Sequence, residues 1–169
     1  MDISTPPATE LRSRFDVQHR ASRAAPEVPL ALRLDRIERI GTLLHTHGAA
    51  LAAAVQADFG VRAPQLTEVA DIFVLRTLLS HTRKHLRGWM KPRRVGVGWR
   101  FLPARAETRA EPVGVVGVIS PWNYPVNLAL IPLATAIAAG NHVYLKPSEH
   151  TPRTAEFLRS LLAEVFPPD

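Results

Sequence analysis

The chain has 169 residues, 46% of them hydrophobic and 21% charged, which is typical of one globular domain with a buried core. None of the 169 is cysteine, so disulfides, thiolate metal sites and a cysteine nucleophile are excluded within this sequence. The longest nearly apolar stretch, Leu128 to Gly140, is interrupted by Pro132 and is shorter than the ~20 residues of a membrane helix. With no signal-peptide pattern at the start, we expect a cytoplasmic protein without membrane contact.

The formal charge of +6 is concentrated in one segment. Between Arg76 and Arg109, ten Lys or Arg residues stand against one acid, Glu107, which gives this stretch a charge of +9. Such a cluster could bind nucleic-acid phosphates, or it could be a solvated helix face followed by a strand edge guarded by arginine. Because no nucleic-acid-binding motif accompanies the charge, we favour the second interpretation and expect no nucleic-acid partner.

The N-terminal half has the apolar spacing of helices. We expect a disordered tail over residues 1–8 and a helical region over residues 9–92. Its first helix is a short amphipathic stretch from Leu11 to Ala24. Apolar side chains then recur at intervals of three, four or seven residues and predict one long helix from Leu30 to Phe59, which Gly60 ends as a C-cap.

A third helical run begins near Pro64, a favoured first-turn residue, and stops before Pro92. We expect its buried face to consist of apolar residues, namely Leu66, Val69, Phe73, Leu79, Leu86 and Trp89. Beyond this run the apolar period changes to two between Val95 and Phe101, which predicts a half-buried or edge strand.

The C-terminal third alternates between strand and helix patterns. Pro112 to Ile119 is a continuous apolar run, typical of a strand buried on both faces. A Leu- and Ala-rich helix is expected from Val126 to Ala139, followed by a second short strand from His142 to Leu145. Thr151 and Pro152 then begin a last helix as its N-cap and first residue.

This order of elements predicts a right-handed parallel βαβ unit. The fold class is therefore α/β, with N-terminal helices followed by the first βαβ unit of a Rossmann-like, doubly wound parallel sheet.

Two polar motifs follow the two predicted strands of this unit. In an open parallel sheet, ligands bind beyond the carboxyl ends of the strands. Lys146 and Glu149, at the end of the second strand, could hold the ribose of an adenosine, with the carboxylate accepting hydrogen bonds from its hydroxyls and repelling a 2′-phosphate. Alternatively, both are solvent-facing charges before a helix.

The first motif, Ser120 to Pro125, contains Asn123 in a turn between two prolines. A fixed amide donor suits an oxyanion hole, where its loss typically costs ~3 kcal/mol of activation free energy. The alternative is that Asn123 caps the following helix.

Two other patterns do not predict binding sites. His81 and His85 share a helix face, but the three residues between them supply two cations and no carboxylate, so we expect no metal site. Gly114 and Gly117 lie within a predicted strand rather than after it, and the third glycine of a dinucleotide fingerprint is missing.

Three segments, Glu111 to Pro125, Ala138 to Asn141 and Lys146 to Pro152, together resemble the N-terminal cofactor-domain motifs of the aldehyde dehydrogenase superfamily. Upstream, Asp58-Phe59-Gly60 and the stretch from Trp89 to Ala106 are similar to its coniferyl aldehyde dehydrogenase branch.

The resemblance implies an NAD(P)-dependent enzyme that oxidises an aldehyde, such as coniferyl aldehyde, to the acid. In the superfamily a cysteine attacks the aldehyde, the adduct passes hydride to NAD or NADP, and a glutamate-activated water releases the acid. Carried over to this chain, Asn123 would be catalytic as the oxyanion donor. The cofactor, NAD with NADP as the alternative, would be bound by Ile119, Ser120, Pro121, Trp122, Lys146, Ser148 and Glu149.

The resemblance also implies that residues 93–110 form oligomerisation-type strands, that residues 111–169 are part of an NAD(P)-binding domain, and that the full-length enzyme is a homo-oligomer. Because the nucleophile and the general base have no counterpart here, we expect this N-terminal portion to be inactive by itself. Two alternatives remain open: a non-catalytic remnant that associates with a full-length subunit, and a basic nucleic-acid-binding protein.

Overall fold

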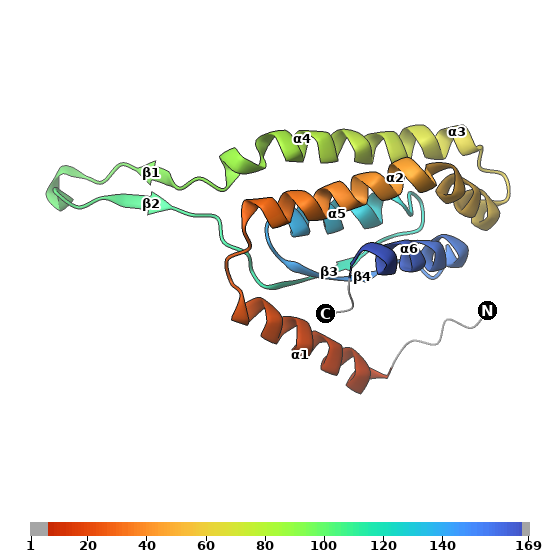
Figure 1. Cartoon of the computed structure of the whole chain (residues 1–169), viewed down its shortest axis with the longest axis horizontal. Coiled ribbons are helices and arrows are strands. Elements are labelled where there is room, and N and C mark those ends of the chain that lie inside the picture. The colour runs from red at the N-terminus through yellow and green to blue at the C-terminus, as the bar shows by residue number, and fades with distance from the viewer. Residues whose placement is uncertain (1–6, 167–169) are drawn as a thin grey trace.

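The computed structural model describes residues 7–166, and its N-terminal half is helical, as the apolar spacing predicts (Figure 1). Helix α1 spans Ala8–Ala24 and α2 spans Leu30–Phe59. Helix α2 ends at the predicted position, because Gly60 adopts φ +75°, a left-handed conformation that suits glycine best. Of the expected tail, residues 1–6 lie outside the described part of the chain, and Ala8 already belongs to α1.

The next helical run has three consecutive parts: α3 (Pro64–Thr67), the π-helix η1 (Glu68–Phe73) and α4 (Val74–Trp89). Part of its predicted buried face is wrong. Leu79 and Leu86 are buried, but the other four residues are exposed: Leu66, Val69, Phe73 and Trp89. Around η1 the inward face carries Thr67, Asp71, Ile72 and Leu75. Asp71 is tolerated there because its charge is neutralised by a buried partner that apolar spacing does not reveal.

The strand expected from Val95 to Phe101 is also wrong. Strand β1 comprises only Arg93–Val95, the chain then turns through the 3-10 helix η2 (Trp99–Phe101), and β2 (Ala106–Thr108) returns antiparallel to β1. This hairpin projects away from the rest of the molecule (Figure 1). All six strand residues are exposed, so the alternation in the sequence does not report a buried face here.

Strand β3 (Val115–Ile119), helix α5 (Asn127–Ala138) and strand β4 (His142–Lys146) form a parallel βαβ unit, which α6 (Pro152–Val165) follows. The α/β fold class is therefore confirmed. The prediction that the first strand is buried on both faces is wrong, since Ile119 is 80% exposed. Within the described residues the parallel sheet has only two strands, and Gly117 and Ile119 of β3 are exposed.

The core lies between the helices. Helix α2 contacts α4, α5 and α6, while α5 packs on β3 and β4 and α1 contacts the same two strands. In Figure 1, α1 lies on the side of the sheet opposite to α2, α4 and α5. The largest side chains buried without exposed surface include Ile37, Ile40, Leu44, Val55, Ile72 and Leu75. No helix of the described chain is long and apolar enough to cross a membrane.

The junction between α5 and β4 sets where the parallel strands begin. Gly140 has φ +91°, and the buried Arg33 guanidinium donates from Nη1 to the carbonyl of Ala138 at 3.1 Å. Asn141 Oδ1 accepts a hydrogen bond from the backbone N–H of Gly114 at 3.0 Å. A side chain of α2 and one amide thus align the starts of both strands.

Candidate functional site

The carboxyl ends of the two parallel strands lie next to each other. Ile119 is paired with Lys146 in the strand register, and the N–H of Ser120 donates to the carbonyl of Lys146 at 3.1 Å. Both polar motifs therefore start side by side at one edge of the sheet, as the βαβ prediction requires.

Lys146 and Glu149 form an ion pair, with Nζ and Oε2 2.6 Å apart. The hydrogen bond from Lys146 lowers the pKa of the Glu149 carboxyl below its ordinary value. Both side chains are more than half exposed, so a ligand could reach the donors of the ammonium and the acceptors of the carboxylate. Ser148 between them is buried, and its hydroxyl accepts a hydrogen bond from the N–H of His150 at 3.2 Å, which shapes the turn.

The other predicted cofactor residues differ in exposure. Ile119 and Pro121 are exposed, and Trp122 is 51% exposed with its ring 6.1 Å from that of Phe59. Ser120 is 4% exposed, and its hydroxyl has no hydrogen-bond partner among the described residues. The Ser120 hydroxyl and the Lys146 ammonium offer donors that suit ribose and phosphate oxygens, and the Glu149 carboxylate offers acceptors that suit ribose hydroxyls.

Asn123 does not cap the following helix, so that alternative is wrong. Its side chain is exposed, while its carbonyl accepts a hydrogen bond from Arg62 Nη1 at 2.7 Å. The first N–H of α5, that of Asn127, donates instead to Asp71 Oδ1 at 2.8 Å. Arg62 holds the backbone of Asn123, and the exposed side-chain amide of Asn123 is therefore accessible to a ligand.

Arg62 and Asp71 are the residues near this site that sequence patterns do not identify. Arg62 Nη2 and Asp71 Oδ2 are 2.7 Å apart, with side chains 6% and 0% exposed. The guanidinium carbon lies 5.1 Å from the ring centre of Phe59 and 5.0 Å from that of Tyr124. Burial raises the pKa of Asp71, against the opposing effects of the Asn127 N–H and the Arg62 charge. The only sequence signal is two opposite charges nine residues apart, which is too common to be diagnostic.

Asp58, at the end of α2, holds the start of α6. Its Oδ2 accepts hydrogen bonds from the N–H and the hydroxyl of Thr154 at 2.8 and 2.7 Å, and its Oδ1 accepts one from the N–H of Arg153 at 3.0 Å. Thr151 occupies the N-cap position as predicted, and Pro152 the first helical one, but the Thr151 side chain makes no capping hydrogen bond. The cap is supplied across 96 residues of sequence.

The histidines of α4 stack instead of converging. The ring centres of His81 and His85 are 4.1 Å apart, and both rings lie near Trp89. His85 Nδ1 is hydrogen-bonded to the His81 carbonyl at 2.8 Å. Within the described residues, no three metal-binding side chains gather at one point.

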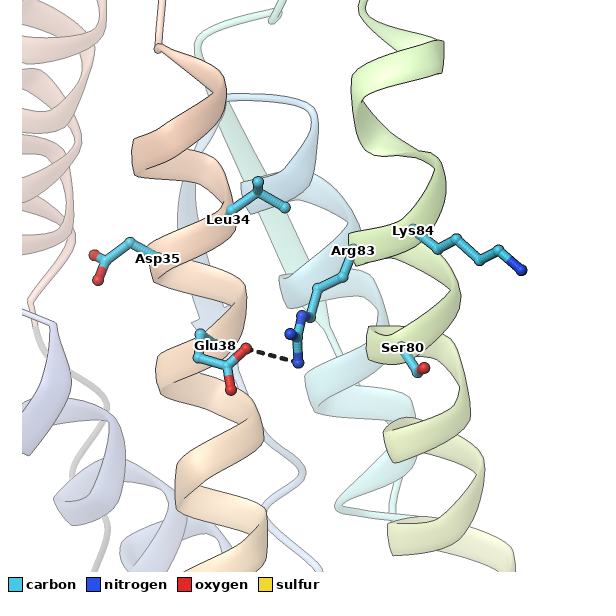
Figure 2. A pocket seen from close by; sticks show the side chains of 6 residues that line it. All are labelled: Leu34, Asp35, Glu38, Ser80, Arg83 and Lys84. Carbon is cyan, nitrogen blue, oxygen red and sulfur yellow. Dashed lines mark ion pairs between the residues drawn. The ribbon is translucent and has the colours of Figure 1, made fainter.

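A hollow on the surface lies elsewhere, between α2 and α4 (Figure 2). Its charged lining includes Glu38 and Arg83, which are 2.8 Å apart and both more than half exposed. None of its six lining residues belongs to the candidate site: Leu34, Asp35, Glu38, Ser80, Arg83 and Lys84.

Comparison with known proteins decides the family. The model of the aldehyde dehydrogenase family matches residues 3–169. The chain belongs to this family. It is 40% identical over 160 residues to a "probable coniferyl aldehyde dehydrogenase" of Pseudomonas aeruginosa, covering 95% of this chain and 34% of the relative. It is 42% identical over 159 residues to the coniferyl aldehyde dehydrogenase of a Pseudomonas species, covering 94% of this chain and 33% of the relative.

The fold agrees with this assignment. The substrate-bound Staphylococcus aureus AldH superposes with a TM-score of 0.88 at 25% identity, covering 99% of this chain and 35% of that one. This aldehyde dehydrogenase chain therefore spans about a third of the length of the relatives it matches.

Proposed function

We propose that this chain is the N-terminal part of an NAD(P)-dependent dehydrogenase that oxidises an aldehyde, in the first instance coniferyl aldehyde, to its acid. The observation that carries the proposal is the pair of parallel strand ends, which bring Ser120-Pro121-Trp122-Asn123 and Lys146-Pro147-Ser148-Glu149 to one edge of the sheet. Similarity to two coniferyl aldehyde dehydrogenases supports the choice of substrate.

In this proposal the residues at the two strand ends would hold a nicotinamide cofactor, which would supply the hydride acceptor for aldehyde oxidation. Lys146 donates to ribose oxygens, and Glu149 accepts from the ribose hydroxyls. Ser148 keeps the turn between them in shape. Ile119, Ser120, Pro121 and Trp122, which follow one another at the end of β3, would line the cofactor site. The negative charge of Glu149 favours NAD, because it repels the 2′-phosphate of NADP.

Asn123 serves as the oxyanion donor. Its side chain is exposed while its carbonyl is tied to Arg62, so the amide can be aimed without its own backbone moving. A donor fixed before the reaction stabilises the oxygen that gains charge when a nucleophile adds to the aldehyde. Residues 1–169 contain no cysteine, so we expect that nucleophile to come from outside this sequence and the chain alone to be inactive.

The test joins residues 1–169 to the part of the Pseudomonas aeruginosa relative that lies beyond the matched segment. We expect this joined enzyme to form NADH from coniferyl aldehyde, and Asn123→Ala to lower its kcat by about 10²- to 10³-fold. The 169-residue chain should form none. Activity of the isolated chain, or a full-rate Asn123→Ala enzyme, would contradict the proposal.

A second candidate is a non-catalytic role by association with a full-length subunit. The projecting β1–β2 hairpin favours it, since Trp99, Phe101 and Leu102 near its tip are all more than two-thirds exposed. It predicts co-purification of the chain with a tagged full-length relative, and loss of that co-purification when the three tip residues are changed to serine. Recovery of the chain as a free monomer would exclude it.

A further inference from the structure

We propose that the buried Arg62–Asp71 pair is a positioning device, which holds the turn around Asn123 in the geometry that its amide needs. The inference rests on the proposed function, because it assigns a purpose to contacts around the proposed oxyanion donor. Arg62 and Asp71 are positioning residues in this scheme and touch neither aldehyde nor cofactor.

The ion pair makes hydrogen bonds to two backbone groups at the turn, the carbonyl of Asn123 and the N–H of Asn127. Arg62 Nη1 donates to the carbonyl of Asn123 at 2.7 Å, while its Nη2 binds Asp71 Oδ2, also at 2.7 Å. The other carboxylate oxygen, Asp71 Oδ1, accepts from the N–H of Asn127 at 2.8 Å. A single chain of charge-assisted hydrogen bonds therefore connects residue 123 to the first residue of α5.

The turn has further anchors on either side. Asn127 Nδ2 donates to the carbonyl of Ala70 at 2.9 Å, which binds the start of α5 to η1 a second time. At the other end, the N–H of Ser120 is bonded to the carbonyl of Lys146. The segment between the anchored residues Ser120 and Asn127 is short, and within it Arg62 binds the carbonyl of Asn123.

Arginine is required for this arrangement, since its planar fork presents parallel donors to two acceptors at once. The rings of Phe59 and Tyr124 lie about 5 Å from the guanidinium carbon, and its Nε has no hydrogen-bond partner among the described residues. Within residues 7–166, the hydrogen bonds of the Arg62 side chain are thus directed at Asp71 and at the turn.

A buried ion pair is poor evidence for stabilisation by itself, because desolvation offsets the attraction of the charges. Here both partners also hydrogen-bond to the backbone around one turn, and that turn contains the proposed oxyanion donor. The cost of burying the pair is explained if the turn must not move.

Arg62→Lys separates positioning from charge neutralisation. Lysine keeps a cation beside Asp71, but one ammonium cannot reproduce the fork that also reaches Asn123. In the joined enzyme we expect kcat to fall at least about 10-fold, with KM for aldehyde and cofactor changed less than about 3-fold, because misplacement affects the reacting geometry more than binding. In the 169-residue chain, 15N relaxation of the Asn123 side-chain amide should report increased motion.

Arg83→Lys is the matched control, since Arg83 pairs with Glu38 at 2.8 Å in the exposed groove of Figure 2 and touches no part of the turn. It should leave both readouts at the wild-type value. The double variant Arg62→Met/Asp71→Leu removes the pair without leaving a buried charge, and should reproduce the loss of kcat and the increased amide motion.

The outcomes separate this inference from the proposed function. Wild-type kcat in Arg62→Lys together with an unchanged Asn123 amide would overturn the positioning role, whatever happens to the melting temperature. An inactive wild-type joined enzyme would contradict the proposed function, and the amide relaxation would then decide whether Arg62 holds the turn.

Discussion

At the scale of the residue, Lys146 and Glu149 form an ion pair with each other, with Nζ and Oε2 2.6 Å apart. Exposed ion pairs contribute little to stability, so a ligand could replace this contact without a large cost. Their partnership lowers the pKa of Glu149, because the ammonium favours the charged carboxylate. The pair is therefore complete at neutral pH and is lost as the pH falls through the lowered pKa of Glu149.

Lys146→Met tests this coupling. Without the ammonium, the pKa of Glu149 should rise towards its ordinary value, as followed by 13C NMR titration of the side-chain carboxyl. Glu156 is an internal control, since its pKa is lowered by the hydrogen bond from Arg159 and should not change. An unaltered Glu149 titration would show that the two side chains are not paired in solution.

Gly140 is a second residue with a specific physical requirement. It has φ +91°, and a Cβ there would lie 2.7 Å from the guanidinium of the buried Arg33. We expect Gly140→Ala to cost roughly 2–4 kcal/mol of unfolding free energy, from backbone strain and overpacking together. Gly41→Ala is the control, because a Cβ at this position of α2 meets nothing within 4 Å, and it should gain about 0.5–1 kcal/mol. Urea unfolding measures both, and equal effects would contradict the reasoning.

At the scale of the element, helices near the site are held at their ends by distant carboxylates. Asp71 receives the first N–H of α5, and Asp58 receives two from α6. Both helices start next to the polar motifs, so these carboxylates place the motifs relative to α2 and η1. The helix dipole adds to the preference for a negative charge at each of these points.

Asp58→Ala should therefore destabilise the chain by about 1–2 kcal/mol, the usual effect of removing an N-cap carboxylate. Thr151→Val, which removes the hydroxyl at the formal N-cap position but keeps the volume, should cost less, because that hydroxyl makes no capping bond. Thermal unfolding of both variants checks this order. A larger loss in Thr151→Val would reverse our assignment of the cap.

At the scale of the whole molecule, the buried core consists mainly of side chains from the helices, and β3 of the parallel sheet has exposed residues. Leu44 in α2 has no exposed surface, whereas Ile119 at the end of β3 is 80% exposed. We expect Leu44→Ala to cost about 2–5 kcal/mol and Ile119→Ala less than about 0.5 kcal/mol in this chain. Chemical denaturation of the two variants gives the comparison. A destabilising Ile119→Ala would mean that β3 is covered in solution, for example by a second copy of the chain.

The sequence predicts features that depend on neighbouring residues, whereas the tertiary structure is needed for contacts between distant segments. Residues 30–59, the βαβ order and the start of α6 at Pro152 follow from local periodicity, glycine and proline, and each is found as predicted. The proximity of the motifs after β3 and β4 is also predictable from the sequence, because the parallel strands of a βαβ unit end at the same edge of the sheet.

What local patterns miss are contacts between segments far apart in the chain. Val69 and Phe73 were expected inside because they are apolar, yet the inward face carries Asp71, whose charge Arg62 neutralises. Only the tertiary structure brings Arg62 and Asp71 into contact with the backbone on either side of the Asn123 turn. It likewise brings Asp58 into contact with the start of α6. The sequence by itself thus determined the elements and the candidate chemistry, since both depend on neighbouring residues, whereas the fold decided how the site is held, since a buried charge is tolerated only where a partner and its acceptors converge.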